Sequence, residues 1–469
     1  MLVFLLFIGV VHISAHAWGV VLDDQGVPLA GANVYWAGTT VGTATDADGR
    51  FELEPVKSTR LLVTSFTGFH NDTTEVTSHA ALTIVLVSNL VLDEVTITER
   101  KMTVLKSRMS AFDTETLTSG EICRAACCNL SESFETSASV DVSYADAATG
   151  AQQIRLLGLS GTYVQLLTEN TPGVRGLAQT FGMEFIPGSW MDAIQVSKGT
   201  SSVINGYEAT AGQINVEYLK PQTGNPLDVN VMLNKELLAE VDLTGGWDIN
   251  EHVSTGVLAH YLDKSMECDD NGDGFQDMPK SRQLNLMNRW YFKKNDYTGQ
   301  ILVHGVYDSR KGGTTRERDL KTKLDPYKID LSTRRVDGFI KNGYVFDHER
   351  NMSIGVITSA SYHEQVNSYG LRQWNASQTN AYLNAIFQTE FDDDKTDPNN
   401  VHGHKLSTGI SVNYDRYREQ VTGIQTNPLT LPRDEVTPGL FAEYTYTYKE
   451  KLTLLAGLRA DWSNQYGFF

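Results

Sequence analysis

The chain has 469 residues and a formal net charge of -18, from 39 Lys and Arg against 57 Asp and Glu. That length predicts two to four domains, and the acidic balance argues against nucleic acid as a partner, because phosphates are neutralised by Lys and Arg. The 20 Tyr, 18 Phe and 39 Gly, with only 12 Pro, favour a protein of many strands and turns.

Residues 1–17 have the organisation of a signal peptide for export. An uncharged apolar run over residues 2–11 is followed by Ala15, His16 and Ala17, which form a small-x-small cleavage pattern. The run is too short to cross a bilayer as a helix, and a buried first strand is the alternative. No Lys or Arg precedes the run, which fits a true start that lies upstream.

Residues 18–89 predict a small β-sandwich. Polar and apolar residues alternate on a strand period and are interrupted by turns, such as the Asp-Gly turn at 48–49. The sequences GVVLD (19–23), GVPLAGANV (26–34) and TDADGRF (45–51) resemble those of the carboxypeptidase-regulatory-like fold, whose members are not enzymes. The resemblance implies an accessory module of about 70 residues.

The segment 90–110 contains one isolated β-prone run followed by polar and charged residues. The centre of the run is formed by Asp93, Glu94, Val95, Thr96 and Ile97. A lone strand with no partner close in sequence is suited to pairing with another chain. Periodicity alone predicts a last strand of the sandwich equally well.

Residues 111–221 predict a mixed domain of helix and strand. Apolar positions four apart within 129–134 fit a short helix. Three further runs fit strands: 139–142, 153–159 and 163–167. The domain closes with the stretch QVSKGTSSVINGYEATAGQINVE at 195–217. No Lys-Ser or Lys-Thr pair follows a four-residue spacer there, so this stretch is not a phosphate-binding loop.

Residues 222–469 predict a transmembrane β-barrel. Segments of about 9 to 11 residues alternate apolar and polar positions, and Tyr, Trp and Phe gather at their ends. Examples are 253–261, 283–292, 297–307 and 439–448. After the amino-terminal run no segment has 18 consecutive apolar residues, so the chain could lie in a membrane only as a barrel, which satisfies its own backbone. A soluble β-rich domain is the alternative.

Taken in order, these segments resemble the TonB-dependent outer-membrane receptors, especially the group with an amino-terminal carboxypeptidase-regulatory-like extension. The resemblance is most specific at 191–221, which is similar to the pattern that ends the plug domain of that family. Residues 154–158 resemble another plug strand, with Leu157 where Arg is usual, and 439–444 and 454–461 resemble barrel strands. The plug pattern is carried by Lys198, Gly199, Ser202, Gly206, Gly212, Ile214 and Asn215.

The resemblance implies a mainly β protein with an amino-terminal β-sandwich, an α+β plug domain and a partial transmembrane antiparallel β-barrel. Gly199, Gly206 and Gly212 would then permit tight turns and close backbone approach in a crowded lumen. The run at 93–97 stands where such receptors keep the TonB box, which implies strand addition with a TonB-type energy-transducing protein of the periplasm. The implied location is the outer membrane of a Gram-negative bacterium, in contact with its lipid.

The implied function is energised uptake, with no cofactor required. The sequence offers no paired carboxylates and no Ser/His/Asp set with usable spacing, so we do not expect an enzyme. A metal ion or metal chelate, such as a siderophore or a copper complex, is the expected ligand. A SusC-like oligosaccharide importer is the alternative within the class, because the same amino-terminal extension is common there. A passive β-rich surface adhesin is the alternative outside it.

Three of the four cysteines cluster in the expected plug: Cys123, Cys127 and Cys128. Thiolates bind soft metals such as Cu(I) and Zn, and residues 127–136 resemble a subgroup of these receptors that is associated with heavy-metal or copper handling. Export to an oxidising compartment also favours a disulfide from Cys123 to Cys127 or Cys128. Metal contact, a disulfide and inert packing are therefore three interpretations of this cluster.

Residues 269–280 resemble a calcium-binding loop. Its candidate ligands are Asp269, Asn271, Asp273 and Asp277. Position twelve is Lys280 rather than Glu, so the loop is not an EF-hand, and a structural Ca²⁺ ion or a solvated acidic turn both fit it.

Two smaller sets of side chains complete the candidates. His402 and His404 could meet a metal or form polar surface. Glu184, Tyr207 and Glu208 are candidates to face the lumen.

The length of the last region conflicts with a complete receptor. Barrels that enclose a plug in this family have about 22 strands, whereas residues 222–469 suffice for about 10 to 12 strands. We therefore expect the amino-terminal part of a 22-stranded barrel, truncated at its carboxyl end, with exposed edge strands that promote aggregation.

Overall fold

The structure is a computed structural model, and it describes residues 17–23, 26–56, 59–66, 69, 71–76, 81–86, 104–106, 113–124, 129–135, 137–199, 201–222, 224–234, 237–321, 325–391, 402–423, 427–448 and 452–469. The chain forms two compact units, Met1–Lys101 and Met102–Phe469. The expected signal segment up to residue 16 lies outside the described residues. The same holds for the TonB-box-like run at 93–97.

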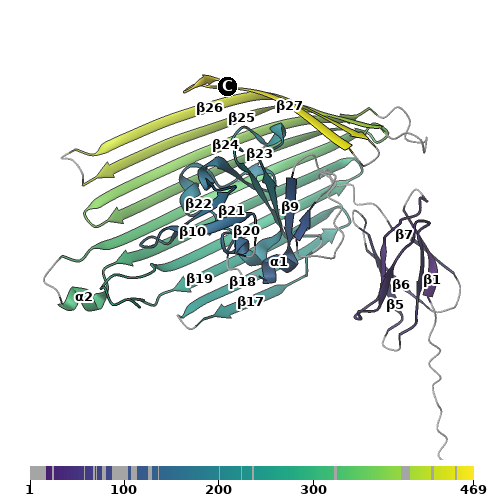
Figure 1. Cartoon of the computed structure of the whole chain (residues 1–469), viewed down its shortest axis with the longest axis horizontal. Coiled ribbons are helices and arrows are strands. Elements are labelled where there is room, and N and C mark those ends of the chain that lie inside the picture. Colours follow the sequence, from purple (N-terminus) through teal and green to yellow (C-terminus); the bar gives the residue numbers. More distant parts are fainter. Residues whose placement is uncertain are drawn as a thin grey trace, which may run out of the picture. The chain divides into compact units, whose positions relative to one another are not determined.

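The first unit contains two small β-sheets (Figure 1). One sheet has the order β4-β1-β7 and the other has the order β3-β2-β5-β6. Their strands are β1 (Ala17–Asp23), β2 (Asn33–Trp36), β3 (Gly42–Ala44), β4 (Arg50–Leu53), β5 (Leu61–Ser65), β6 (Asp72–Glu75) and β7 (Leu82–Leu86). Alternate residues are buried in a common core that includes Val21, Trp36 and Leu62. The indole Nε1 of Trp36 donates to the carbonyl of Glu54 at 2.8 Å, which satisfies its polar atom.

The Asp-Gly turn of this unit is closed by its own side chain. The Asp46 carboxylate accepts the backbone N–H groups of Asp48 at 2.9 Å and Arg50 at 2.8 Å. Gly49 follows with a φ of 70°, a left-handed conformation that glycine adopts without a steric penalty. The turn therefore leads directly into β4.

The second unit begins with a plug domain built around two sheets. A six-stranded sheet has the order β14-β13-β16-β15-β9-β8, and a three-stranded sheet has the order β10-β11-β12. The elements are β8 (Val104–Lys106), β9 (Asp113–Thr118), α1 (Ser119–Arg124), η1 (Glu132–Phe134), β10 (Val140–Asp146), β11 (Ala151–Leu156), β12 (Leu159–Ser160), η2 (Gly161–Tyr163), β13 (Val164–Thr168), β14 (Thr171–Pro172), η3 (Gly176–Thr180), η4 (Gly188–Trp190), β15 (Met191–Lys198), η5 (Val203–Asn205) and β16 (Gly212–Tyr218). No helix among the described residues is long and apolar enough to cross a bilayer.

Two plug elements differ from their prediction. The strand expected over 153–159 stops at Leu156, because Leu157 and Gly158 have φ values of 54° and 78° and turn the chain back into β12. Two consecutive left-handed residues form the tight turn that matches the twist of a hairpin. The short helix expected within 129–134 is a single 3₁₀ turn, Glu132–Phe134.

The rest of the second unit is one antiparallel sheet in which each strand pairs with the next along the chain. Its elements are β17 (Asp228–Leu233), β18 (Leu238–Asn250), β19 (Val253–Lys264), β20 (Lys280–Lys294), β21 (Tyr297–Gly313), α2 (Arg316–Lys321), β22 (Lys328–Asp347), β23 (Met352–Tyr369), β24 (Arg372–Glu390), β25 (His402–Thr422), β26 (Leu429–Tyr448), β27 (Leu452–Ser463) and β28 (Gly467–Phe468). Most strands exceed the 9 to 11 residues of the sequence segments, because polar residues continue the hydrogen-bonded ladder beyond the apolar part.

The polarity of this sheet is the reverse of that in a soluble protein. Along β20 the buried and exposed residues alternate strictly: Gln283 (5% exposed), Leu284 (40%), Asn285 (0%), Leu286 (52%) and Met287 (2%). In this run Gln283 and Asn285 face inward and Leu284 and Leu286 face outward, with Met287 as an inward apolar residue that packs on the plug core. A mainly polar inner face and an apolar outer face are typical of strands that separate lipid from a lumen. This reversal decides against the soluble β-rich alternative and confirms the predicted fold class.

Aromatic side chains gather at one rim of the sheet. Trp290 and Phe292 stack near the end of β20, with ring centroids 6.3 Å apart. Tyr344 and Phe346 lie near the end of β22, with centroids 5.2 Å apart, and Tyr344 pairs in register with Tyr297 of β21. An aromatic rim beside an apolar band marks the level of lipid headgroups in such sheets.

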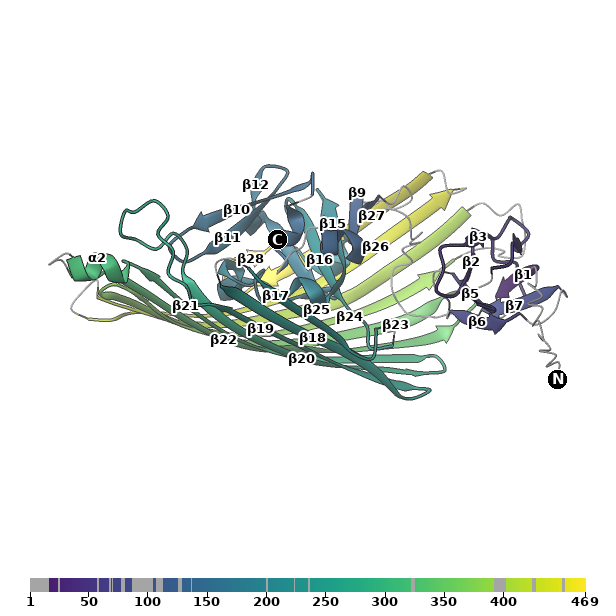
Figure 2. The ribbon, with the colours of Figure 1, turned by 90° about the horizontal axis from the view of Figure 1, so that it is seen from below.

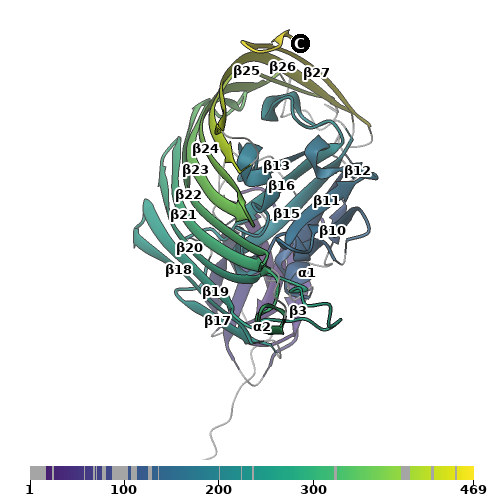
Figure 3. The same cartoon turned by 90° about the vertical axis from the view of Figure 1, so that its left-hand side faces the viewer.

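The sheet curves around the plug. Figures 2 and 3 show the plug strands on the concave side of β17 to β27. The twelve strands agree with the 10 to 12 predicted, and they run in order from β17 at one edge to β28 at the other. The concave surface therefore carries the contacts that position the plug.

Gly212 is expected to tolerate no side chain. Its φ is 150°, and an added Cβ would lie 2.3 Å from the carbonyl oxygen of Ser197 and 2.5 Å from Cδ2 of Leu156. Gly212→Ala should therefore lower plug stability by several kcal/mol. Gly199→Ala is the control, because Gly199 is also left-handed (φ 78°) but faces open space, so the cost is only about 1–2 kcal/mol. The measurement is urea-dependent cleavage of the plug by trypsin, and equal midpoints for both variants would contradict the crowding argument.

Candidate functional site

The plug meets the sheet through buried charged groups that come from turns between plug elements. Glu169 occupies the turn between β13 and β14, where it and Asn170 have φ values of 52° and 57°. A two-residue left-handed turn is the standard tight connection between antiparallel strands. The turn projects the Glu169 carboxylate, whose residue is 1% exposed, toward the sheet.

Four groups converge on the Glu169 carboxylate. Oε1 accepts from Arg289 Nη1 of β20 at 3.1 Å and from the backbone N–H of Tyr218 at 3.0 Å. Oε2 accepts from Lys220 Nζ at 2.9 Å and lies 3.7 Å from Lys341 Nζ of β22. One plug carboxylate thereby links the end of the plug to two strands of the sheet.

The charge of Glu169 is stabilised by this surround. Burial alone raises the pKa of the carboxyl, but Arg289, Lys220 and Lys341 lower it further than burial raises it. The net pKa lies below the ordinary range of a glutamate. The group is therefore ionised in the folded protein at neutral pH.

Arg175 makes a second link near the start of η3. It forms an ion pair with Glu208 at 2.5 Å within the plug and another with Asp415 of β25. Asp415 is fully buried and also accepts from Gln378 Nε2 at 2.8 Å and Asn380 Nδ2 at 3.0 Å. The charged pair is thus embedded in a polar network of the sheet wall.

Glu184 makes a third link, with Arg310 of β21. Two parallel contacts, at 2.9 Å and 3.2 Å, form a bidentate pair, and Arg310 also binds Asp308 at 2.8 Å. The guanidinium lies 4.3 Å from the ring centre of Phe181. Burial raises the pKa of Glu184 above its usual value, although Arg310 opposes the rise.

A fourth link uses the motif recognised in the sequence. Ser202 Oγ donates to Glu443 Oε2 of β26 at 2.7 Å, and Arg459 Nη1 of β27 donates to the carbonyl of Val203 at 2.9 Å. Asn384 Nδ2 of β24 donates to the carbonyl of Ile204 at 3.0 Å. Ser202 is thus the motif residue whose side chain reaches the sheet.

The other motif residues act inside the plug. Lys198 pairs with Glu115 of β9 at 3.3 Å, and Ile214 is a fully buried core residue. Asn215 Oδ1 accepts the backbone N–H of Asn170 at 2.8 Å and so supports the turn that carries Glu169. Gly206 has a φ of 117°.

Apolar contacts accompany the ion pairs. The plug core extends onto four inward residues of the sheet: Leu258, Met287, Leu302 and Phe339. Phe181 and Phe185 of the plug form a second cluster with Val306, Ile329 and Leu331. The interface therefore combines apolar packing with buried charged links.

The candidates Tyr207 and Glu208 lie at the same interface. Glu208 binds Arg175, and the ring of Tyr207 contacts that of Phe469, with centroids 5.1 Å apart. Burial is the main cause of a raised pKa at Tyr207.

Other sequence candidates are not brought into this interface. In the calcium-like loop, the side chains of Asp269, Asn271, Asp273 and Asp277 accept backbone N–H groups of residues 270 and 273–275. His402 and His404 contact the hydroxyls of Tyr446 and Tyr444 at 2.7 Å and 2.6 Å.

The cysteine cluster is only partly covered by the structure. Cys127, Cys128 and the Cys123 side chain lie outside the described residues, and Cys268 is a free, partly exposed thiol.

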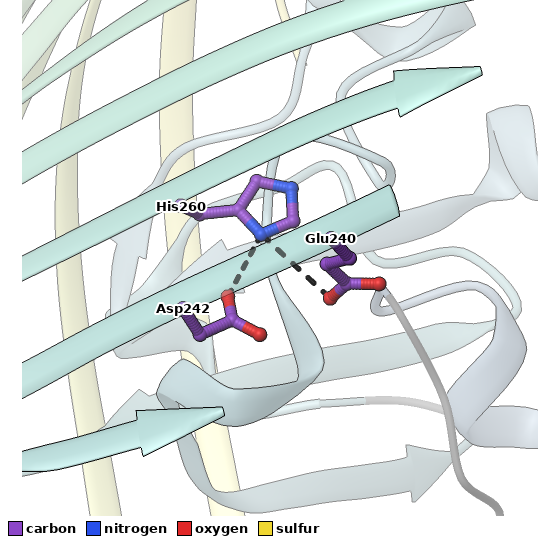
Figure 4. A group of neighbouring side chains, drawn as sticks. All are labelled: Glu240, Asp242 and His260. Atoms are coloured by element: carbon purple, nitrogen blue, oxygen red, sulfur yellow. Dashed lines mark hydrogen bonds and ion pairs between the residues drawn. The ribbon is translucent and has the colours of Figure 1, made fainter. Parts of the chain in front are cut away.

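One group of side chains was missed by sequence reasoning. Glu240 and Asp242 of β18 and His260 of β19 are buried, and their potential ligand atoms lie within 4.8 Å of one another (Figure 4). Within the described part of the chain, no second group of three His, Cys, Asp or Glu side chains meets that criterion. The Glu-x-Asp spacing was a visible signal, but the pairing with His260 depends on strand register.

Comparison with known proteins identifies relatives of both units. Residues 18–99 match the CarboxypepD_reg-like domain family, and residues 106–213 match the TonB-dependent Receptor Plug Domain family. The TonB-dependent receptor SusC of Bacteroides thetaiotaomicron is 28% identical over 225 residues, which cover 45% of this chain and 22% of that protein. The TonB-dependent receptor P39 of Formosa agariphila is 31% identical over 105 residues, which cover 22% of this chain and 10% of that protein.

Solved structures share the fold at low sequence identity. The alcaligin outer membrane receptor FauA from Bordetella pertussis aligns with a TM-score of 0.59 at 12% identity, covering 76% of this chain and 56% of that one. The copper transporter OprC aligns with a TM-score of 0.57 at 14% identity, covering 77% and 55%. The chain thus spans about half the length of these structures and less of the two receptors matched by sequence.

Glu169→Gln is expected to loosen the plug, because Arg289, Lys220 and Lys341 would then face a neutral amide. Removing one partner of a buried pair costs about 3–5 kcal/mol. The measurement is the urea midpoint of plug cleavage by trypsin in detergent. Glu364→Gln is the control, since it removes an exposed pair with Arg334 at 4.0 Å worth less than about 1 kcal/mol. Similar midpoints for the two variants would refute the role of Glu169.

Repeating the same assay at several pH values separates the loss of the Glu169 charge from a packing defect in Glu169→Gln. Because the folded pKa of Glu169 is lowered, its stabilisation is fully present above the unfolded pKa of about 4.3 and is lost as pH falls below it. The difference between wild type and Glu169→Gln should therefore shrink on acidification. The raised pKa of Glu184 changes the pH dependence of stability in the opposite direction. This contribution is the same in wild type and in Glu169→Gln, so it cancels when their stabilities are subtracted. A difference that persists at low pH would indicate a packing defect instead.

Proposed function

Since the chain joins a CarboxypepD_reg-like domain to a TonB-dependent receptor plug domain, it is a homologue of the TonB-dependent receptors, and we propose that it serves energised uptake across the outer membrane. The main support for the proposal is the way in which the plug is attached to the sheet. Glu169, Arg175 and Glu184 attach it to the polar concave face of the sheet. A plug attached in this way can close a lumen and still be displaced.

The chemistry of the interface favours displacement. When a buried ion pair separates into a water-filled lumen, both partners regain hydration, which offsets much of the lost Coulomb attraction. An all-apolar interface of the same size would instead expose surface at about 25 cal/mol per Å². The charged links therefore hold the plug at a cost that an energised partner can supply.

The order of the plug sheet indicates where force would act. β8 is the edge strand on the amino-terminal side of the plug sheet, β9 is next, and β9 pairs with β15. Tension applied at 93–97 by a TonB-type protein would reach β8 first and then β9. Hydrogen bonds at an edge strand can break one after another, which requires less force than shearing a central strand. The proposed partner thus acts on the part of the plug that is simplest to detach.

The proposed ligand is a metal ion or metal chelate. The support is the Cys123, Cys127 and Cys128 cluster of the plug sequence, whose thiols suit soft metals. A second candidate is an oligosaccharide, as in a SusC-like importer. The observation that favours it is the sequence match to the receptor SusC at 28% identity over 225 residues.

A disulfide between plug and sheet is expected to stop uptake. An added Cβ at Gly457 of β27 would lie 3.5 Å from Cβ of Val203 in η5, within the range that a disulfide bridges. Val203→Cys combined with Gly457→Cys should block transport in oxidised cells and recover with a reductant.

The assay measures cellular uptake of radiolabelled iron or copper chelates and of labelled oligosaccharides in parallel. The compound whose uptake is blocked by the disulfide is the transported ligand. Each single variant is the control. Full uptake by the cross-linked protein would exclude movement of this part of the plug.

Val95→Pro is expected to abolish uptake without loss of ligand binding. Proline removes a backbone N–H and so interrupts strand addition. Val95→Ala keeps the donor and should transport normally. Binding and uptake are measured on the same cells, and normal uptake by Val95→Pro would rule out 93–97 as the docking strand.

A further inference from the structure

We propose that Glu240, Asp242 and His260 form a binding site for a divalent transition-metal ion, with zinc as the ion that suits it. The site lies in the concave wall of the sheet (Figure 4). It goes beyond the proposed uptake, because the ion is resident in the wall and is not the transported ligand.

The sheet ladder places the three side chains on one face. Glu240 and Asp242 are two apart on β18, so their side chains point to the same side of the sheet. His260 of β19 is the direct register partner of Asp242, and directly opposed residues have neighbouring side chains on one face. The convergence therefore follows from backbone pairing and does not depend on one choice of rotamer.

The distances suit a shared ion after small side-chain rotations. His260 Nδ1 lies 2.8 Å from Asp242 Oδ1 and 3.7 Å from Glu240 Oε1. Ligand atoms about 2.1 Å from a tetrahedral zinc ion are about 3.4 Å apart. The two observed separations bracket that value, and all three ligands would be of the nitrogen and oxygen types that zinc accepts.

The electrostatics of the wall favour a cation at this position. The three residues are 3%, 2% and 2% exposed, and carboxylates buried this deeply are stabilised by an ion pair or by coordinating a metal ion. Elsewhere in the wall, the Asp337 carboxylate beside His304 is balanced by Arg335 at 2.7 Å. Asp242 instead contacts His260 Nδ1 at 2.8 Å, Asn230 Nδ2 at 3.3 Å and the side chain of Ser189.

One of the three side chains, His260, opens onto a cavity. Its volume is about 130 Å³, and it lies between plug and sheet, with His260 in its lining beside Glu184, Asp308 and Arg310. A cavity of this size and polarity holds water. Three protein ligands with a water molecule in the fourth position is the usual arrangement of an accessible zinc site.

The ligand set selects against the hard cations. Ca²⁺ and Mg²⁺ prefer shells of oxygen atoms, whereas one imidazole with two carboxylates suits zinc and its neighbours in the first transition row. The site is therefore chemically distinct from the loop at 269–277.

The test is zinc binding by the full chain in detergent, after removal of metals with a chelator. His260→Gln and Asp242→Asn should each weaken zinc binding at least about 100-fold, the upper end of the effect of removing an outer-shell partner. His304→Gln is the matched control, since it removes a buried histidine of the same wall that faces one carboxylate. Undiminished affinity in both site variants would overturn the proposal.

X-ray absorption on the zinc-loaded wild type keeps the test independent of how the variants fold. We expect only nitrogen and oxygen neighbours, at about 2.0–2.2 Å, with one imidazole. Sulfur neighbours at about 2.3 Å would assign the ion to the cysteines instead, and loss of binding in His404→Gln would assign it to the surface histidines; either result overturns the proposal. Uptake assays are a separate measurement, so failure of this site leaves the proposed transport untouched, and the reverse also holds.

Discussion

The reversed polarity of the curved sheet is the constraint on which the rest of the molecule depends. A strand alternates its side chains between two faces. Here the convex face receives mainly Leu, Val and Ile, whereas the concave face receives many Gln, Asn, His, Arg and Asp side chains around a few apolar ones such as Leu258 and Phe339. A wall with this many polar groups cannot be filled by an apolar core alone. It requires an occupant that brings its own charges and hydrogen-bonding groups.

The wall satisfies part of its charge along single strands. Asp308 with Arg310, Arg335 with Asp337, and Arg459 with Asp461 are pairs two residues apart on one face of one strand. Other wall charges take their partner from the plug, as Asp415 does from Arg175 and Arg289 does from Glu169. The plug thus completes the electrostatics of the wall, which explains why its contact residues lie on turns and short 3₁₀ segments whose side chains are free to reach outward.

The sequence allowed much of this architecture to be predicted. The segments with period two, the order of the domains and the motif at 191–221 identified a plug followed by barrel strands, because each is a local pattern. Local patterns also misled in two places. The run at 153–159 looked like one continuous strand, but Leu157 adopts a left-handed conformation that its residue type does not predict. The helix predicted within 129–134 is a single 3₁₀ turn.

By itself, the sequence determined the fold class, the polarity of the two sheet faces and the motif residues of the plug, since alternation and turn chemistry act between neighbours in the chain. Only the tertiary structure decided which charges meet. Arg175 and Asp415 are 240 residues apart, and Ser202 and Glu443 are 241 apart. Pairing at such separation depends on the register of many strands in succession, and a shift of one residue would turn each side chain to the other face. For the same reason the sequence did not predict that His260 lies beside Glu240 and Asp242, since their proximity depends on the register between β18 and β19.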